Sequence, residues 1–200
     1  MSHYYSYDPN LKSKKTIVKY TFKSSLVTLN SDLGVFSKDR VDFGTNVLLN
    51  SLSDELLEKV NTVLDLGCGY GIIGVSIAKK YPNMLVDMID VNKRCVELTL
   101  ENIKSNNLKN AKAFESNLYN EVNNKYDMII SNPPIRAGKE VVFSVVSDAF
   151  NHLNDNGFII VVIQKKQGAP SLIKKMEEVF NNIEVLNKEK GYYILKSERR

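Results

Sequence analysis

The residues with the clearest chemical potential are closely spaced glycines that follow a short apolar run. Residues 63–74 read Val-Leu-Asp-Leu-Gly-Cys-Gly-Tyr-Gly-Ile-Ile-Gly, a pattern that predicts a strand, a tight loop and the start of a helix. Glycine is favoured where the backbone turns sharply, adopts positive φ or touches a ligand. Gly67, Gly69 and Gly71, at alternate positions, therefore predict a loop against which a flat ligand binds.

A second candidate group is an acid at the end of the next predicted strand. Residues 84–89 form this apolar strand, and Asp90 follows it directly. Nucleotide-binding α/β folds place an acid at about this distance from the glycine loop, where its carboxylate accepts hydrogen bonds from both ribose hydroxyls. The alternative is that Asp90 only caps the helix that begins near Asn92. The preceding glycine loop favours the ribose role.

Asp65, two residues before the first glycine, indicates which ligand this loop takes. NAD-dependent dehydrogenases share the glycine loop and the downstream acid, so those two features do not separate the ligand classes. A dinucleotide brings its pyrophosphate to the helix N-terminus, where a carboxylate would repel it. S-adenosylmethionine has no phosphate, keeps the ribose, and carries an ammonium and a sulfonium group. It therefore suits both Asp65 and Asp90; the alternative is a buried Asp65 that only ties loop amides together.

The most specific chemical signal is Asn132-Pro133-Pro134-Ile135, which follows a predicted strand. Two prolines fix φ and keep Asn132 out of helical geometry, so its amide would be held rigidly where open α/β sheets bind ligands. Asn132 Oδ1 and the Pro133 carbonyl could accept both hydrogens of a planar amino group and aim its lone pair at a methyl group. Rate would come mainly from positioning, without a strong general base. An ordinary strand-ending loop is the alternative.

The elements that must position these residues alternate between strand and helix from residue 61 onward. Such alternation predicts a mostly parallel sheet covered by helices on both faces, a doubly wound α/β fold. The expected strands are 62–66, 84–89, 111–114, 126–131, 157–163, 182–187 and 191–196, and the expected helices are 72–80, 92–106, 139–153 and 170–180. Gly191 predicts an antiparallel hairpin of the last two strands at the sheet edge.

The N-terminal part of the chain carries other patterns. Residues 1–15 have no periodicity and predict a flexible tail. Residues 16–22 and 26–29 alternate apolar and polar side chains around a short turn, which predicts a β-hairpin. The further expected elements are a loop at 31–37, a helix over 46–52 and a short helix capped by 53–55. A chain of 200 residues can bury one good core, so we expect a single domain over 16–200, with 16–45 as a β extension and a loop covering the cofactor.

Composition restricts the class of protein. No run of about 18 apolar residues exists, and the first residues lack the regions of a signal peptide, so we expect a cytoplasmic protein without a membrane partner. Two cysteines are too few for a disulfide framework, and no metal site is expected. The net charge of +4 comes from basic ends around an acidic middle. This pattern suits a polyanionic partner or an ordinary solvated lysine surface.

Taken together, these motifs resemble a known family. The glycine loop with Asp65, Asp90 and the Asn132-Pro-Pro turn look like a class I S-adenosylmethionine-dependent methyltransferase of the amino-nitrogen type. The similarity extends to the small-domain methyltransferases related to the bacterial small-subunit ribosomal RNA guanine-N2 methyltransferase. The motifs that carry it are Gly34-Val-Phe-Ser37, Val41-Asp-Phe-Gly-Thr45, Asn132-Pro-Pro-Ile-Arg-Ala-Gly138 and Gln164-Lys-Lys-Gln-Gly-Ala-Pro170. The resemblance implies a Rossmann-like seven-stranded sheet whose last strand is antiparallel, with an N-terminal β-hairpin extension.

The resemblance also implies roles for individual residues. Gly67, Gly69 and Gly71 would approach the methionine part of S-adenosylmethionine, Asp65 would lie near its ammonium, and Asp90, with Val91 beside it, would hold the ribose. Ser116 and Asn117 occupy the place where related enzymes have an acid that accepts from the adenine amino group, and the Asn117 carbonyl could still accept. Phe36, Asp42 and Gly44 would close over the cofactor from the N-terminal side.

Two departures from the family pattern concern the substrate. Many amino methyltransferases have Phe or Tyr where this chain has Ile135, so the base-aromatic stacking worth roughly 1–3 kcal/mol is missing. The ribosomal RNA enzyme also carries a second, degenerate domain that this chain lacks. Basic residues near the expected mouth of the site supply a substitute for binding RNA phosphates: Arg136, Lys139, Lys165 and Lys166.

The predicted function is an N-methyltransferase that acts on a guanine exocyclic amino group in ribosomal RNA, free or within the small ribosomal subunit. The alternatives are another planar nitrogen (adenine N6 or a protein glutamine amide), a non-catalytic cofactor-binding module for RNA or ribosome assembly, and an NAD-dependent dehydrogenase. The sequence predicts neither the target nucleotide nor the oligomeric state.

Overall fold

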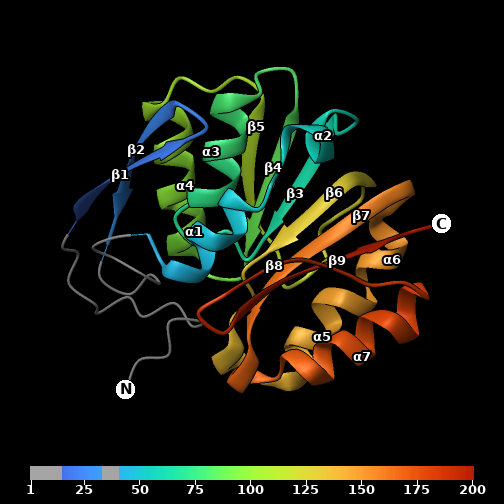
Figure 1. Cartoon of the computed structure of the whole chain (residues 1–200). Coiled ribbons are helices and arrows are strands. Elements are labelled where there is room, and N and C mark those ends of the chain that lie inside the picture. Colours follow the sequence, from blue (N-terminus) through green and yellow to red (C-terminus); the bar gives the residue numbers. More distant parts are fainter. Residues whose placement is uncertain (1–14, 33–40) are drawn as a thin grey trace.

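A seven-stranded sheet with helices on both faces forms the body of the computed structural model, which describes residues 15–32 and 41–200 (Figure 1). The strand order is β5-β4-β3-β6-β7-β9-β8, with β9 antiparallel to both of its neighbours. The strands are β3 (Thr62–Leu66), β4 (Leu85–Asp90), β5 (Ala111–Glu115), β6 (Tyr126–Ser131), β7 (Leu153–Gln164), β8 (Glu184–Glu189) and β9 (Tyr192–Glu198). The predicted doubly wound sheet, with its last strand antiparallel, is confirmed.

Alternating burial explains why this sheet needs helices on both faces. In β6, Met128 and Ile130 point into one hydrophobic core and Ile129 into the other, and all three are fully buried. Such uninterrupted apolar strands are typical of parallel sheets with two covered faces. One face carries α1 (Phe43–Asn50), α3 (Ile72–Lys80) and α4 (Lys93–Ser105), and the other carries α5 (Lys139–Ser147), α6 (Ala149–His152) and α7 (Ala169–Phe180).

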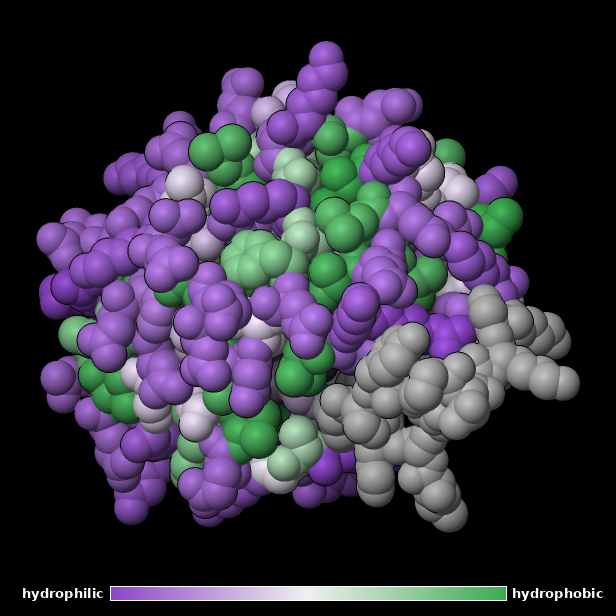
Figure 2. Space-filling model, turned by 180° about the vertical axis from the view of Figure 1, so that it is seen from behind, coloured by the Kyte–Doolittle hydropathy of each residue, from purple (hydrophilic) through white to green (hydrophobic). Residues whose placement is uncertain are grey.

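The face of the molecule that is seen from behind is largely hydrophilic (Figure 2). Apolar side chains appear there in limited areas among charged and polar ones. Within the described ranges no helix is both long and apolar enough to cross a membrane.

The N-terminal hairpin forms a separate two-stranded sheet of β1 (Thr16–Phe22) and β2 (Ser25–Ser31), as predicted. Two asparagines, Asn102 in α4 and Asn106 at its C-cap, replace a third strand along the free edge of β2. Asn102 accepts from the Asn30 N–H at 2.7 Å and donates to its carbonyl at 2.9 Å, and Asn106 bonds both backbone groups of Thr28. The hairpin is therefore docked on α4 by amide side chains that mimic a strand.

Several element boundaries differ from the predicted ones. Helix α1 begins three residues earlier than expected, because the Asp42 carboxylate accepts a hydrogen bond from the Thr45 N–H and caps it. The single helix expected over 139–153 is interrupted at Asp148, and β7 already begins at Leu153, which is fully buried and pairs with Tyr126. The remaining short elements are α2 (Asp54–Leu57) and the two 3₁₀ turns η1 (Ile135–Ala137) and η2 (Lys165–Gln167).

Some sequence expectations fall on residues 1–14 and 33–40, which lie outside the description. These expectations are the flexible tail, apart from Lys15, most of the loop at 31–37, and Phe36 as a residue covering the cofactor. Lys15 is described, and its ammonium forms an ion pair with Glu101 of α4 at 2.7 Å.

Replacing Asn102 tests the docking of the hairpin. Asn102→Ala leaves the Asn30 backbone groups and the Tyr70 carbonyl without their amide partner, so the free energy of unfolding should fall by about 1–3 kcal/mol. Urea denaturation measures this change, and hydrogen exchange should show faster exchange in β2. The control is Asn123→Ala, at an exposed position, which should change stability by less than about 0.5 kcal/mol. Equal stability of both variants would contradict the docking role.

Candidate active site

A cavity of about 260 Å³ opens where the parallel strands β3, β4 and β6 end. Open α/β sheets bind ligands at this edge. Its lining comes from the glycine loop, the ends of β4 and β6, the loop after β5, and the helices α1, α3 and α5. The lining residues are Thr45, Leu66, Gly67, Cys68, Gly69, Tyr70, Ile72, Ile73, Ile89, Asp90, Val91, Ser116, Asn117, Leu118, Asn132, Pro134, Ala137, Val141 and Val145.

The glycine loop forms one wall of this cavity through its backbone. Gly67 and Gly69 have φ of 76° and 59°, and a Cβ at either position would meet no atom within 4 Å, so this side of the loop faces open space. The N–H groups of Gly67 and Cys68 both donate to the Ile89 carbonyl at 2.9 Å. The loop is thus fastened to the end of β4, and a ligand can approach the bare backbone.

Asp90 lies at the point where the glycine loop meets β4. One carboxylate oxygen accepts from the Gly69 N–H at 2.9 Å and the other from the Asn92 N–H at 2.8 Å. Burial raises the pKa of the Asp90 carboxyl above its usual range, against the effect of these hydrogen bonds. Each oxygen retains a further lone pair, so Asp90 can still accept from a ligand in the cavity that it lines.

Val91, expected beside the ribose, and Ser116 and Asn117, expected near the adenine, all line the cavity. Val91 is 44% exposed and lies beside Asp90, while Ser116 and Asn117 follow β5 on the neighbouring loop. The Ser116 hydroxyl donates to the Leu118 carbonyl at 2.7 Å, so it organises its own loop. The exposed Asn117 side chain is the polar group of this loop that lines the cavity without such a bond.

Asp65 lies behind the glycine loop and does not line the cavity. Its side chain is fully buried, and one oxygen accepts from the Gly74 N–H at 2.9 Å, the loop-tying role considered as the alternative. The second oxygen, Oδ1, is buried and has no hydrogen-bond partner within residues 15–32 and 41–200. Burial raises the pKa of Asp65 to about 7; the Gly74 bond opposes this rise and the charge of Asp90 adds to it.

The Asn132 side chain is oriented by the start of α1. Its Nδ2 donates to Thr45 Oγ1 at 2.8 Å and to Asp42 Oδ2 at 3.2 Å. Because both hydrogens of the amide are engaged, Oδ1 remains as the free acceptor of this side chain. Asn132 and Pro134 line the cavity, whereas Pro133 is buried. The Asn-Pro-Pro turn therefore presents a fixed acceptor at the end of β6.

Other predicted residues lie outside the lining. Asp42 contributes by accepting a hydrogen bond from Asn132. Gly44 packs against Tyr192, where an added Cβ would come within 2.8 Å of the ring. Gly71 is buried at the start of α3. The exposed or partly exposed positions beyond the lining are Ile135, Arg136, Lys139, Lys165 and Lys166.

Sequence reasoning missed several lining residues. Thr45 belongs to the Val41-Asp-Phe-Gly-Thr45 motif, but only the contact of its hydroxyl with Asn132 reveals its role. Val141 and Val145 lie one helical turn apart on α5, a spacing that is typical of any core-facing helix stripe. Tyr70 lies between two glycines and lines the cavity. Its hydroxyl is buried without a hydrogen-bond partner among the described residues, and burial raises the pKa of the hydroxyl, with a further contribution from Asp42.

The electrostatics of the cavity favour a cationic ligand. Among its described lining residues Asp90 is the only charged one, and no Lys or Arg is present to meet a pyrophosphate. In the described part of the chain no group of three or more His, Cys, Asp or Glu residues could hold a metal ion. A carboxylate in a pocket without other charged side chains attracts positive charge and repels phosphate.

Comparison with known proteins adds independent information. The uncharacterized protein YbxB of Bacillus subtilis is 44% identical and covers 98% of both chains. Ribosomal RNA small subunit methyltransferase C of Haemophilus influenzae is 33% identical over 80% of this chain, which spans only 48% of that relative. The 16S rRNA N2 G1207 methyltransferase of T. thermophilus, solved with AdoMet and guanosine, superposes with a TM-score of 0.83 at 27% identity, covering 96% of this chain and 52% of that one.

A model of the methyltransferase small domain matches residues 26–196, which include the glycine loop, Asp90 and the Asn132-Pro-Pro turn. The predicted family resemblance is thereby confirmed, and the chain belongs to the methyltransferase small domain family.

Proposed function

We propose that the protein transfers the methyl group of S-adenosylmethionine to the exocyclic N2 amino group of a guanine in ribosomal RNA. The observation that carries this proposal is the orientation of Asn132. Its Nδ2 is held by Thr45 and Asp42, which leaves Oδ1 as an acceptor beside a cavity with cofactor-binding features.

The residues of the cavity fit S-adenosylmethionine. The open side of Gly67 and Gly69 gives the methionine part access to the bare backbone, and Asp90 can accept from the ribose hydroxyls. The buried Tyr70 hydroxyl has no partner among the described residues and would donate to the cofactor's carboxylate. Because Asp65 lies behind the loop, it would act on the ammonium through its field, in its ionised form, which predominates above its pKa of about 7. The absence of Lys and Arg from the described lining disfavours a dinucleotide.

Asn132 can position the amino group that receives the methyl group. Its Oδ1 and the Pro133 carbonyl would accept the two N–H bonds of a planar amine, which localises the nitrogen lone pair and fixes its direction. The cofactor, when bound, supplies an electrophilic methyl group on sulfur. The Asn132 amide is neutral and its support, Asp42, already accepts from the Thr45 N–H and Asn132. Positioning, which can contribute about 7–11 kcal/mol, would therefore supply most of the rate rather than a strong base.

The choice of guanine in RNA rests on relatives and on the rim of the cavity. The H. influenzae and T. thermophilus proteins are named for methylation of small-subunit ribosomal RNA, and the latter binds guanosine in its structure. The exposed Arg136 and Lys139 follow the Asn-Pro-Pro turn, and the exposed Lys165 and Lys166 follow β7. These cations suit RNA phosphates. Adenine N6 and a glutamine amide offer the same planar amino group, so they remain the second candidate substrates.

Labelled S-adenosylmethionine tests the proposal directly. The protein is incubated with small ribosomal subunits, free ribosomal RNA, DNA and total protein, and the labelled group is identified; we expect N2-methylguanine in ribosomal RNA. Asn132→Ala should lower kcat by about 100-fold or more, because the acceptor amine is no longer aligned, while cofactor affinity changes little. Undiminished transfer by Asn132→Ala would refute the role of Asn132, and label in protein alone would refute the RNA substrate.

Tyr70→Phe tests the contact with the cofactor's carboxylate. Loss of a hydrogen bond to a charged group should weaken S-adenosylmethionine binding by about tenfold, measured by calorimetry. Binding of methylthioadenosine, which lacks the amino-acid part, should not change. The free protein should be as stable as wild type or more so, since an unpartnered buried hydroxyl is removed.

The matched control for Tyr70 is Tyr126→Phe. The Tyr126 hydroxyl donates to Asp87 at 2.6 Å near the start of β6, so its loss should lower stability without changing the ratio of the two affinities. Equal weakening of both ligands in Tyr70→Phe would show that the hydroxyl does not meet the carboxylate.

The raised pKa of Asp65 predicts a pH dependence of stability. Between its unfolded pKa near 4 and its folded pKa of about 7, the folded state holds a proton that the unfolded state releases. The Asp65 contribution is therefore fully present below about pH 4 and is lost as pH rises toward 7. Urea denaturation across this range should show a fall in wild-type stability relative to Asp65→Asn, which does not titrate. Parallel pH profiles of the two proteins would exclude a raised pKa.

A further inference from the structure

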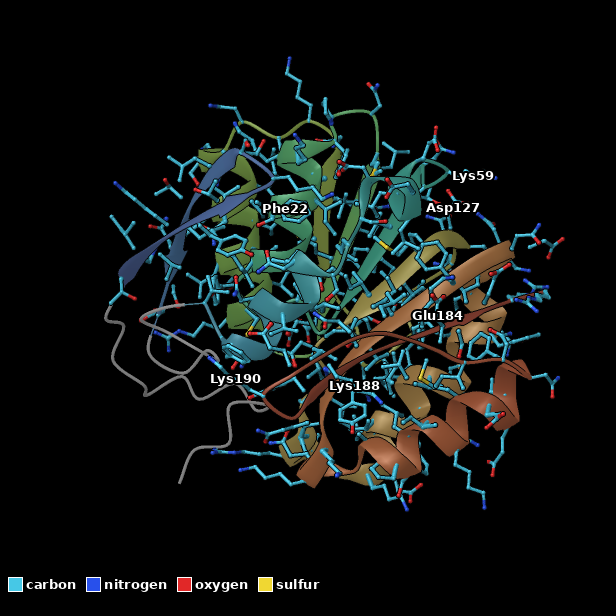
Figure 3. All side chains as sticks on the ribbon, in the orientation of Figure 1. Phe22, Lys59, Asp127, Glu184, Lys188 and Lys190 are labelled. Atoms are coloured by element: carbon cyan, nitrogen blue, oxygen red, sulfur yellow. The ribbon has the colours of Figure 1, made fainter. Side chains whose placement is uncertain are left out.

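The tip of the β8–β9 hairpin, which we call the β8–β9 turn, comprises residues 188–192: the last two residues of β8, Lys190 and Gly191 between the strands, and the first residue of β9. Its two lysines, Lys188 and Lys190, lie at the same end of the sheet as the cavity. The last residue of β7, Gln164, pairs with Tyr192 at the start of β9, and the Lys165 N–H donates to the Gly191 carbonyl at 2.7 Å. The turn is therefore adjacent to η2. Figure 3 shows Lys188 and Lys190 at this end of the sheet, with Lys59 and Asp127 at the opposite end.

Contacts connect this turn to the wall that holds Asn132. Tyr192 packs on Phe43 with the ring centroids 5.5 Å apart, and the same ring lies against Gly44. The next residue, Thr45, accepts the hydrogen bond from Asn132 at 2.8 Å. The position of the turn is thus fixed relative to the acceptor amide by packed side chains of α1 and β9.

The two lysines present positive charge that the described residues do not neutralise. The Lys188 ammonium lies 4.9 Å from the Tyr193 ring centroid and the Lys190 ammonium 4.9 Å from that of Phe43. Neither forms a salt bridge within residues 15–32 and 41–200, whereas Lys196, in the same hairpin, pairs with Glu184 at 3.2 Å. A cation–π contact orients an ammonium at modest gain, about 0.5–1 kcal/mol at exposed sites, and leaves its charge available.

The charge at this turn belongs to a larger basic rim. Lys165 and Lys166 on η2 adjoin the turn, and Arg136 on η1 and Lys139 at the start of α5 follow the Asn-Pro-Pro segment. The Lys139 ammonium likewise lies 4.9 Å from an aromatic centroid, that of Phe143. We define the basic rim as Arg136, Lys139, Lys165, Lys166, Lys188 and Lys190. Two exposed acids, Glu140 and Glu189, lie next to these cations in the sequence. The positive charge of the basic rim is therefore divided among separate side chains and does not form a continuous patch.

We infer that the β8–β9 turn is an RNA-binding element, in which Lys188 and Lys190 contact phosphates of nucleotides that flank the target base. This inference rests on the proposed function. The ammonium groups of Lys188 and Lys190 already cover faces of Tyr193 and Phe43, so a base cannot stack on those faces. The two lysines therefore contact RNA phosphates, and this contact does not depend on the RNA sequence. The turn thereby extends the RNA-binding surface beyond η2 toward α1. It adds affinity to that of Arg136 and Lys139, and it compensates for Ile135, which has no aromatic ring on which a base could stack.

Salt-dependent binding tests this inference. A fluorescently labelled single-stranded RNA is titrated with wild type and with Lys188→Ala/Lys190→Ala at several salt concentrations. Removing two phosphate contacts should reduce the slope of log affinity against log salt by about 1.4. With ribosomal RNA as substrate, KM should rise several-fold while kcat at saturation and S-adenosylmethionine affinity stay unchanged.

Two matched variants separate charge near the site from other effects. Lys59→Ala/Lys125→Ala removes the same charge at exposed positions before β3 and β6, at the opposite end of the sheet, and should leave the slope unchanged. Lys188→Arg/Lys190→Arg keeps the charge and should keep the slope. An equal fall in both alanine pairs would mean a general charge effect and would overturn the inference.

The outcomes also distinguish this inference from the proposed function. If wild type methylates ribosomal RNA but the Lys188→Ala/Lys190→Ala slope equals that of wild type, the turn does not bind RNA and the function stands. If the label appears only in protein while the slope still falls, the surface binds RNA and the proposed substrate is wrong. Binding to anionic lipid vesicles, without binding to RNA, would overturn the assignment of the partner.

Discussion

The site depends on how the backbone passes from β3 to α3. Within five residues the chain leaves a buried strand, turns back on itself and enters a helix, which requires left-handed φ at Gly67, Gly69 and Gly71. Residues with a Cβ rarely adopt this conformation. The turn brings the Gly67 and Cys68 amides onto the Ile89 carbonyl and the Gly69 amide onto Asp90. The same geometry that joins two strands thereby creates a bare backbone wall beside a carboxylate.

A second constraint links the N-terminal part of the chain to the end of β6. The Asp42 carboxylate caps α1 and also accepts a hydrogen bond from Asn132 Nδ2, and Thr45 of the same helix accepts the other. One helix start thus determines which atom of the asparagine amide is left to act as an acceptor. An amide reversed by 180° would present donors and could not bind an amino group through its N–H bonds. The helix is therefore part of the site although it precedes the glycine loop by some 20 residues.

Charge is divided between the interior of the site and its rim. Asp65 and Asp90 lie beneath and beside the cavity, where burial raises both pKa values, and no cation lines the cavity among the described residues. The cations lie outside, on η1, α5, η2 and the β8–β9 turn. Low dielectric surroundings strengthen the field of the inner carboxylates, while exposed lysines act on a polyanion through salt-sensitive contacts. This division suits a small cationic ligand inside and a large anionic one outside.

The sequence by itself determined the features that arise from local chemistry. Short apolar runs between helical segments predicted six of the seven strands of the main sheet to within two residues, because the apolar character of a strand is read from its own residues and does not depend on distant partners. The glycines at 67, 69 and 71 and the prolines at 133 and 134 predicted a loop and a rigid turn, because these residues restrict or free their own backbone. These motifs were sufficient for the family and for the edge of the sheet at which the cavity lies.

Only the tertiary structure decided the features that depend on contacts between distant segments. It placed Asp65 behind the loop, although spacing in the sequence suggested that it faced the ligand. It oriented the Asn132 amide through Asp42 and Thr45, about 90 residues earlier, and it brought the lysines of the β8–β9 turn to the rim. Periodicity contains no information on which atom of a side chain meets another segment. That choice is made by packing, when helices cover both faces of the sheet and the two cores form.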